Sequence, residues 1–213
     1  NKIMITKRVH LDHLIKRQSI RYYDKGEIKE KINRLETDND DRIRYSDING
    51  DWFKNIRKPD FQRETIAWSP EECVEFLDSV VNGRIIPSVI LWQSEENGRI
   101  YVLDGAHRLS VIRAWMIDDW GDKSKEYYLR RNKDDIFQIS EFTRKLVNKQ
   151  IGSFADYKKS YEEREELLDK NIDDLRSKMS ERKVNQAGFY SKAFLRNKSL
   201  YAQWVIGDYD TAE

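Results

Sequence analysis

The chain has 213 residues, of which 38% are hydrophobic and 36% are charged. Its 39 basic and 38 acidic side chains give a net charge of +1, so overall charge does not select a nucleic acid as partner. No apolar run approaches the roughly 20 residues of a membrane span, and the first residues lack the apolar core of a signal peptide. A soluble, cytoplasmic protein is therefore expected. The single cysteine, Cys73, has no second thiol for a disulfide or a zinc site.

This length is enough for one core and a small helical appendage. Residues 1–45 are strongly charged and are expected to form an N-terminal segment. The clearest structural patterns lie in the middle of the chain, where we expect a main domain at 46–152. Residues 153–213 are expected to form a mainly helical C-terminal extension.

A capping box predicts the first clear helix. Ser69 can accept a hydrogen bond from the amide of Glu72, whose side chain can reach back, and Pro70 suits the first helical position. The helix should run from Pro70 to about Asn82, with Gly83 as the stop signal. Its apolar positions follow the helical period and predict a buried face: Val74, Leu77, Val80 and Val81.

Two strands should follow this helix. Residues 85–92 form a continuous apolar, β-branched run, which is typical of a strand buried on both faces. Residues 94–98 read as a hairpin loop, and residues 99–103 as the partner strand.

The segment Asp-Gly-Ala-His-Arg at 104–108 joins this second strand to a helix that should continue to about Asp119. A helix that begins directly after a glycine turn presents free backbone amides, which is a phosphate-binding geometry. Arg108 could grip two phosphate oxygens, and Asp104 could cap the helix, hold Arg108 or place a magnesium ion. Asp-Gly is also a common turn dipeptide, and an arginine in a first helical turn often faces water. A lone histidine such as His107 is more often a hydrogen-bonding residue than a catalytic base.

A second polar cluster occupies residues 57–64. Pro59 forces extended backbone at Lys58, and charged residues surround one aromatic anchor, which suggests a rigid contact loop. Arg57 and Lys58 are the candidate DNA contacts. Gln62 and Arg63 offer donors for phosphate, ribose or base edges.

The C-terminal half is less distinct. Residues 136–150 are expected to form a strand and then a helix, and a long helix should span about 153–185. Its apolar stripe should pack on its own domain or on a neighbouring helix, or, as a weaker alternative, form a homo-oligomeric coiled coil. The stripe comprises Tyr161, Leu168, Ile172, Leu175 and Met179.

Four motifs in a fixed order carry a family resemblance: RKPDFQRE at 57–64, WSPE at 68–71, IPSVILW at 86–92 and DGAHRLS at 104–110. The chain resembles the ParB/sulfiredoxin-like N-terminal domain shared by GmrSD modification-dependent restriction enzymes and phosphorothioate-sensing SspE proteins. The resemblance is close over roughly residues 45–121. It implies an α/β (α+β) fold: a small mixed sheet with packed helices.

The resemblance further implies a pocket that binds and hydrolyses a nucleoside triphosphate, GTP or ATP, with Mg²⁺. Many relatives have glutamine in place of His107, which weighs against proton transfer by its imidazole. The implied catalytic residues are Asp104, His107 and Arg108. The implied nucleotide-binding residues are Gln62, Arg63, Gly105, Ala106 and Ser110.

The function expected from the resemblance is nucleotide-dependent sensing of foreign or modified DNA in phage defence. Relatives continue beyond residue 208 into a C-terminal domain that is often a nuclease, so an effector nuclease domain or partner subunit is the expected partner. The rival expectation is a non-catalytic DNA-binding or protein-interaction module whose 104–108 turn grips a DNA phosphate. A nuclease acting directly on DNA would need a metal-binding carboxylate cluster that the sequence does not present.

Overall fold

A computed structural model describes residues 8–19, 41–94, 99–123, 133–170, 177–196 and 198–205. Six strands of these residues form one mixed sheet in the order β1-β3-β5-β4-β6-β2. The strands are β1 (Arg17–Gln18), β2 (Arg42–Arg44), β3 (Ile56–Pro59), β4 (Val89–Gln93), β5 (Ile100–Asp104) and β6 (Ser199–Val205). The mixed α/β class expected from the resemblance is confirmed.

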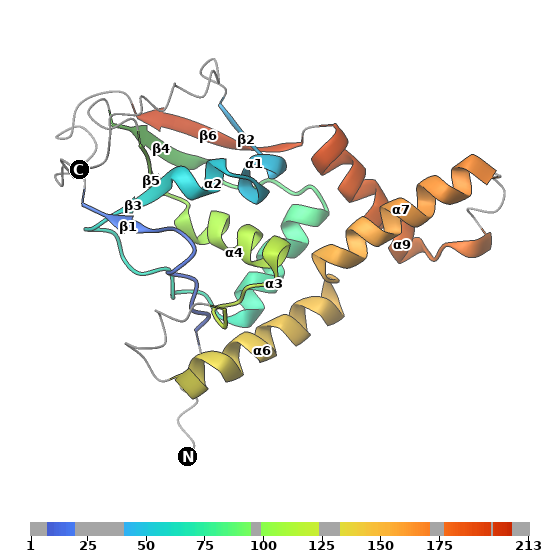
Figure 1. Ribbon diagram of the computed structural model, residues 1–213, viewed down its shortest axis with the longest axis horizontal. Helices are drawn as coiled ribbons and strands as arrows, with labels where there is room; N and C mark the ends of the chain where they lie inside the picture. Colours follow the sequence, from blue (N-terminus) through green and yellow to red (C-terminus); the bar gives the residue numbers. More distant parts are fainter. Residues whose placement is uncertain are drawn as a thin grey trace.

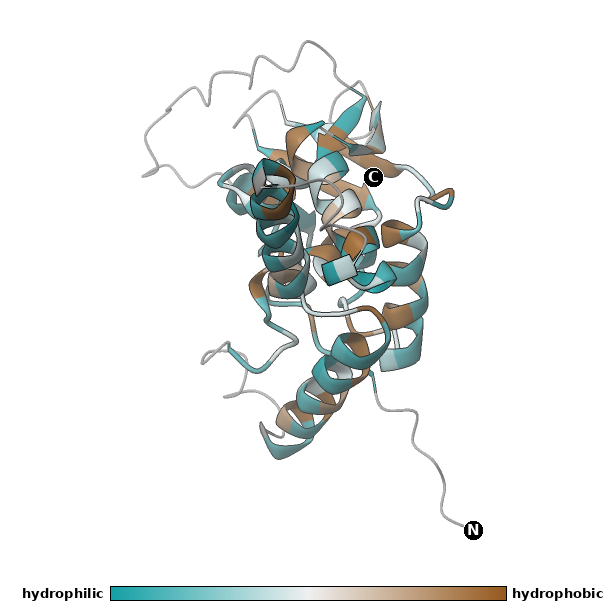
Figure 2. Ribbon diagram, turned by 90° about the vertical axis from the view of Figure 1, so that its right-hand side faces the viewer, coloured by the Kyte–Doolittle hydropathy of each residue, from teal (hydrophilic) through white to brown (hydrophobic). Residues whose placement is uncertain are grey.

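Helices cover one side of this sheet and extend beyond it (Figure 1). Figure 1 shows α4 and α3 below the sheet, α6 beneath them, and α7 with α9 projecting to one side. In Figure 2 the brown, hydrophobic segments gather where these elements meet. The helical elements are α1 (Tyr45–Asn49), α2 (Trp52–Asn55), α3 (Pro70–Val81), α4 (Ala106–Ile117), α6 (Lys133–Gln150), α7 (Phe154–Lys170), α9 (Glu181–Tyr190) and the π-helical turn η1 (Ser191–Leu195).

Helix α3 begins as the capping box predicts. The Glu72 amide donates to Ser69 Oγ at 3.2 Å, and the Ser69 amide donates to Glu72 Oε2 at 2.7 Å. At the other end Gly83 has φ +69°, and its amide donates to Val80 O. The predicted apolar face is turned inward, and Leu77 is fully buried.

The strand predicted at 85–92 is shorter than expected, because β4 begins at Val89. Residues 85–88 lie outside the sheet, and the side chain of Ile85 is 99% exposed. Pro87 has no amide hydrogen to donate to a neighbouring strand. The predicted hairpin is confirmed, since β4 and β5 pair antiparallel. Most of its loop, 95–98, lies outside the described residues.

Strand β5 leads directly into α4, as predicted, and the helix is buried around much of its circumference. Its apolar stripe lies in the core, where Leu109 and Ile112 are fully buried. Trp115 is 2% exposed and donates from Nε1 to Gly152 O at 2.9 Å. This packing fixes the direction of α4 against the sheet.

The strand predicted within residues 136–150 is wrong, because α6 is one continuous helix from Lys133 to Gln150. Its buried residues Ile136, Ile139 and Val147 recur at helical spacing, and the helix packs against α3. The short apolar pair at 136–137 imitates the start of a strand, but only Ile136 is buried, whereas Phe137 is 52% exposed.

The single helix predicted over 153–185 is also wrong. The described part of α7 runs to Lys170, and the break is shown at Ser180, which has extended backbone and caps α9 by accepting from the Lys183 amide. The two helices pack on each other, with Tyr161 stacked on Tyr190 at 5.4 Å between ring centroids. The apolar stripe predicted from Tyr161 onward therefore packs, where it is described, on a neighbouring helix of the same chain. Ile172 and Leu175 lie outside the described residues.

The C-terminal extension is not only helical, because β6 returns to the sheet between β4 and β2. One core cluster therefore draws on the whole described chain, from Val9 near the start to Ala202 near the end. The division at 45 and 152 stays a prediction about sequence organisation. Among the helices of the described residues, none combines the length and apolar character needed to cross a membrane.

Candidate anion-binding site at the start of helix α4

The turn between β5 and α4 requires glycine. Gly105 has φ +96°, a left-handed conformation that glycine adopts without steric cost. A Cβ atom there would lie 3.0 Å from both Arg108 Nη2 and a methyl group of Val89. Gly105 is also the N-cap of α4, and no described side chain caps the helix. The first amides of α4, beginning at Ala106, are thus left for an external acceptor, and the helix dipole favours an anion there.

Arg108 lies beside this helix end, held at one of its terminal nitrogens. Nη2 donates to Ser88 O at 3.0 Å and to Asp104 Oδ2 at 2.6 Å. The Arg108 side chain is only 16% exposed, and its buried Nε has no hydrogen-bond acceptor among the described residues. A buried guanidinium N–H without an acceptor is costly, and a bound oxyanion is the partner that suits it.

His107 connects α4 to the loop that precedes α3. Its Nε2 accepts a hydrogen bond from the Ala67 amide at 3.2 Å, and its ring stacks on Trp68 with centroids 5.8 Å apart. Burial, reinforced by the charge of Lys58, lowers the pKa of His107 below its ordinary value. The imidazole is therefore neutral at pH 7, and its Nε2 lone pair is already engaged. The geometry gives His107 a positioning role and argues against its acting as a base through Nε2.

Gln62 is brought next to the 104–108 turn. Its Nε2 donates to Val102 O at 2.6 Å and also to Leu103 O, the two residues before Asp104. Arg63, the next residue, is exposed. The loop of residues 60–68 and the start of α4 thus form one site, although about 40 residues separate them in the chain.

Two predicted site residues are placed where they cannot serve the predicted role. Lys58 is fully buried, so its ammonium cannot meet a DNA phosphate. Successive residues of a strand point to opposite faces, and Lys58 points inward whereas Arg57 does not. Ser110 is also fully buried on the inner side of α4, so its side chain cannot reach a ligand at the helix start.

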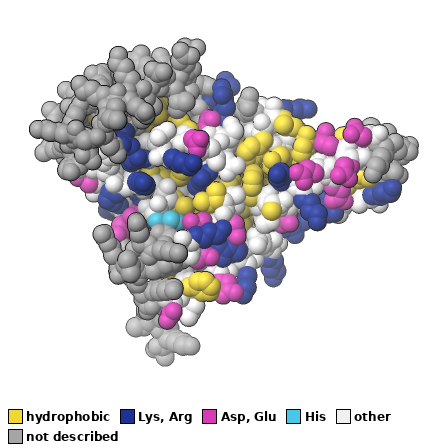
Figure 3. All heavy atoms as spheres, in the orientation of Figure 1, with side chains coloured by type: hydrophobic (Ala, Val, Ile, Leu, Met, Phe, Trp, Pro, Cys, Tyr) yellow, Lys and Arg dark blue, Asp and Glu magenta, His cyan; other side chains and the backbone are white. Residues whose placement is uncertain are grey.

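Arg57 keeps an outward position on β3. Its Nε donates to Gln18 Oε1 at 3.1 Å, and its Nη1 donates to the carbonyls of Lys54 and Ile56. Figure 3 shows Lys and Arg side chains gathered over β3, α2 and the start of α4. A local basic surface therefore accompanies the site despite the near-zero net charge.

Residues 8–18 contact the loop that carries Gln62, which the sequence did not reveal. Asp12 and Arg17 hydrogen-bond to the loop that carries Gln62. The partners lie more than 40 residues apart, so no local spacing signals the contacts.

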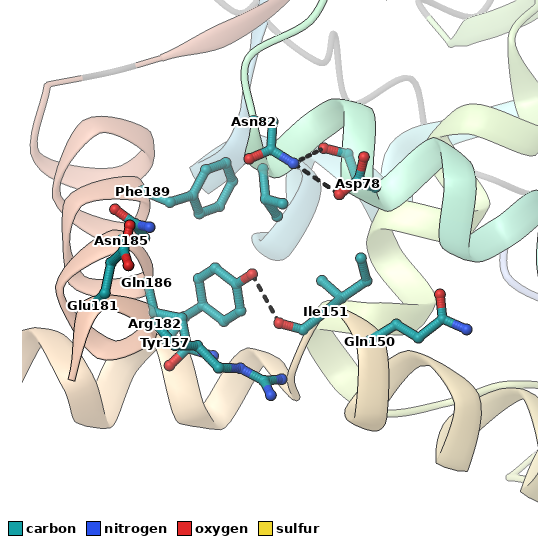
Figure 4. A pocket seen from close by; sticks show the side chains of 11 residues that line it. Asp78, Asn82, Gln150, Ile151, Tyr157, Glu181, Arg182, Asn185, Gln186 and Phe189 are labelled. Carbon is teal, nitrogen blue, oxygen red and sulfur yellow. Dashed lines mark hydrogen bonds between the residues drawn. The ribbon is translucent and has the colours of Figure 1, made fainter.

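A separate cavity of about 370 Å³ lies between the end of α3 and the α7–α9 pair (Figure 4). Figure 4 shows Tyr157 bonded to Ile151 O, and Asn82 bonded to Asp78, around its rim. None of the 104–108 residues lines this cavity. It is therefore distinct from the site at α4.

Within the described ranges, no group of three or more His, Cys, Asp or Glu side chains is placed to hold a metal ion. Asp104 nevertheless offers one carboxylate, 60% exposed, at the mouth of the site. A magnesium ion that arrives with a triphosphate needs only one or two protein carboxylates besides phosphate and water. Asp104 fits that requirement.

A scan against protein families matches residues 45–209 to the GmrSD restriction endonuclease, N-terminal domain. The chain belongs to this family. The matched segment includes the 60–68 loop and the 104–108 turn, and it leaves out residues 8–18. No curated protein and no solved structure matches the chain. The GmrSD membership places the domain among restriction and phage-defence proteins.

Proposed function

We propose that this GmrSD-type domain binds the phosphates of GTP or ATP at the start of α4 and hydrolyses the nucleotide while sensing foreign or modified DNA. The observation that carries the proposal is the buried Nε of Arg108, which lacks an acceptor beside the uncapped amides of α4. A phosphate at the start of α4 would accept from these amides, and Arg108, the third residue of the helix, would supply a cation for it. The expectation of nucleotide binding came from the resemblance to ParB/sulfiredoxin-like domains. We therefore also propose that the fold is of this type.

Hydrolysis would proceed by attack of water on the γ-phosphorus, with cleavage of the bond to the β–γ bridging oxygen and release of diphosphate nucleotide and phosphate. Such a reaction mainly needs positioning and charge stabilisation, and the protein supplies no covalent nucleophile. Arg108 and the α4 amides would stabilise charge on the transferred phosphoryl group. Mg²⁺, when bound, supplies further charge neutralisation, and Asp104 is the residue that would hold it.

His107 would act by placing the loop and not by moving a proton. Its neutral ring joins Ala67 to α4 and stacks on Trp68, so it fixes one wall of the site. Gln62 would fix the opposite side by its bonds to the end of β5. Arg63, exposed on the same loop, is a cation that would contact a ribose or phosphate.

DNA is the proposed macromolecular partner, and an effector nuclease, as a C-terminal domain or a partner subunit, would act on the signal. The rival function is a module whose turn grips a DNA phosphate without hydrolysis. The outward Arg57 and the basic surface of Figure 3 favour DNA contact in either case. Self-association through α7 and α9 remains a prediction.

Phosphate release distinguishes the two functions. Purified protein would be incubated with each nucleoside triphosphate and Mg²⁺, with and without DNA, alongside an Asp104→Ala variant. The proposal expects turnover with GTP or ATP that depends on Asp104. DNA binding without nucleotide turnover under all conditions would establish the rival function.

A further inference from the structure

The segment of residues 8–18 lies outside the family-matched region and yet is tied to the site loop at three backbone positions. The amide of Val9 donates to Trp68 O at 2.8 Å, that of Leu11 to Thr65 O at 3.0 Å, and that of Lys58 to Lys16 O at 2.9 Å. Its strand, β1, pairs parallel with β3 at the edge of the sheet (Figure 1). The segment therefore spans the loop from one end to the other.

Arg17, at the exposed start of β1, binds the backbone of that loop through its guanidinium. Its Nη1 donates toward the carbonyl oxygens of Pro59 at 3.3 Å, Asp60 at 3.0 Å and Gln62. Carbonyl dipoles that converge on one point repel one another unless a cation lies between them. Arg17 therefore sets the curvature of the loop at Gln62, and the Gln62 side chain then reaches the end of β5.

Asp12 holds the cations of this arrangement in place. Its Oδ1 accepts from Lys58 Nζ and from the Thr65 amide at 2.8 Å, and it lies 3.5 Å from Arg17 Nη2. Lys58 Nζ also donates to Thr65 Oγ1 at 2.8 Å. Burial alone would raise the pKa of Asp12, but the bonds from Lys58 and Thr65 bring it below its ordinary value. The carboxylate is therefore ionised at neutral pH.

We infer that Arg17 is a positioning residue of the candidate nucleotide site and that residues 8–18 are an integral part of that site. Asp12 and Lys58 anchor the loop, and Arg17 sets its curvature. This curvature places the Gln62 side chain against the end of β5, next to the 104–108 turn. This inference rests on the proposed function where it concerns nucleotide binding. That Arg17 orders the loop of residues 59–65 does not depend on any nucleotide.

The test compares Arg17→Ala with Lys16→Ala, which removes a cation from the adjacent position; both residues are exposed. Amide hydrogen exchange of residues 60–65 is measured first, without nucleotide. We expect exchange about tenfold faster in Arg17→Ala and unchanged in Lys16→Ala, because local opening follows the lost bonds. Arg17→Lys keeps the charge but loses the planar fork, so it should restore protection in part.

Binding of GTP and ATP with Mg²⁺ is then measured by calorimetry on the same proteins. Arg17→Ala should bind about tenfold more weakly, whereas Lys16→Ala should match the wild type. Unchanged loop exchange in Arg17→Ala would overturn the inference, as would faster exchange with unchanged affinity. If the wild type binds neither nucleotide, the proposed function fails and the site assignment fails with it. The exchange data would then still decide whether Arg17 orders the loop.

Discussion

Arg108 and Asp104 face each other across the first turn of α4, with Nη2 2.6 Å from Oδ2. The arginine is largely buried, whereas the aspartate is mostly exposed. The pair therefore holds the guanidinium against the site while leaving a carboxylate at its mouth. This relationship links the charge of the site to both anion and metal binding, and the first prediction follows from it.

Asp104→Asn should affect two properties in opposite directions. Removal of the carboxylate charge should strengthen metal-free triphosphate binding by about 2- to 5-fold, the scale of a partly exposed ion pair. Hydrolysis with Mg²⁺ should fall, because the residue that would hold the ion is lost. Titration in chelator and phosphate release in Mg²⁺ measure the two effects. Equal weakening of both would mean that Asp104 acts only by holding Arg108.

Trp115→Ala should destabilise the fold by about 3–5 kcal/mol, as expected for a buried aromatic side chain. Trp115 contacts the rings of Phe154, Tyr157 and Phe189 and donates to Gly152 O. Denaturant unfolding gives the free energy. Phe137→Ala, at a half-exposed position, is the control and should cost less than about 1 kcal/mol.

The neutral His107 predicts a loss of stability in mild acid. Because its folded-state pKa is lowered, the unfolded chain takes up the proton first as pH falls through about 6.5. Its contribution should be constant above that pH, decline below it, and level off beneath the folded-state pKa. Urea unfolding between about pH 8 and pH 5 should show this decline in the wild type relative to His107→Gln. Parallel curves for the two proteins would show that His107 does not titrate differently on folding.

DNA binding should depend on salt, because affinity must come from local cations that release counterions. Arg63→Ala should reduce the salt slope by about 1, whereas exposed Lys145→Ala, on α6, should leave it unchanged. Gel shifts across a salt series measure the slopes. The same protein should show little double-strand cleavage in Mg²⁺ or Mn²⁺. Strong metal-dependent cleavage that Asp104→Ala abolishes would place the effector activity in this domain.

Local signals in the sequence were sufficient for α3 and for the start of α4. Ser69 and Glu72 are three residues apart, and Gly105 takes its left-handed conformation directly before the first residue of α4, so residues close in sequence signal both features. The location of the candidate site at 104–108 could be proposed for the same reason. Strand β6 could not be predicted from the sequence, because its pairing with β4 is a contact between distant segments.

The direction of a side chain was harder to predict than its position. Lys58 lies in a charged sequence, but β3 turns it inward to Asp12, which is 46 residues away. Ser110 is in the same helix as Arg108 but on its buried side. These outcomes depend on which face of an element meets the core, and tertiary packing decides that.

Titration of GTP and ATP into the wild type and Arg108→Ala, in Mg²⁺, tests the phosphate site most directly. Arg84→Ala, an arginine in an exposed ion pair with Asp78, is the matched control. We expect Arg108→Ala to bind about 10- to 100-fold more weakly, the value of a lost charge-assisted hydrogen bond, and to unfold at nearly the wild-type denaturant concentration. The control should bind as the wild type does. Wild-type affinity in a folded Arg108→Ala protein would contradict the assignment of a phosphate site to the start of α4.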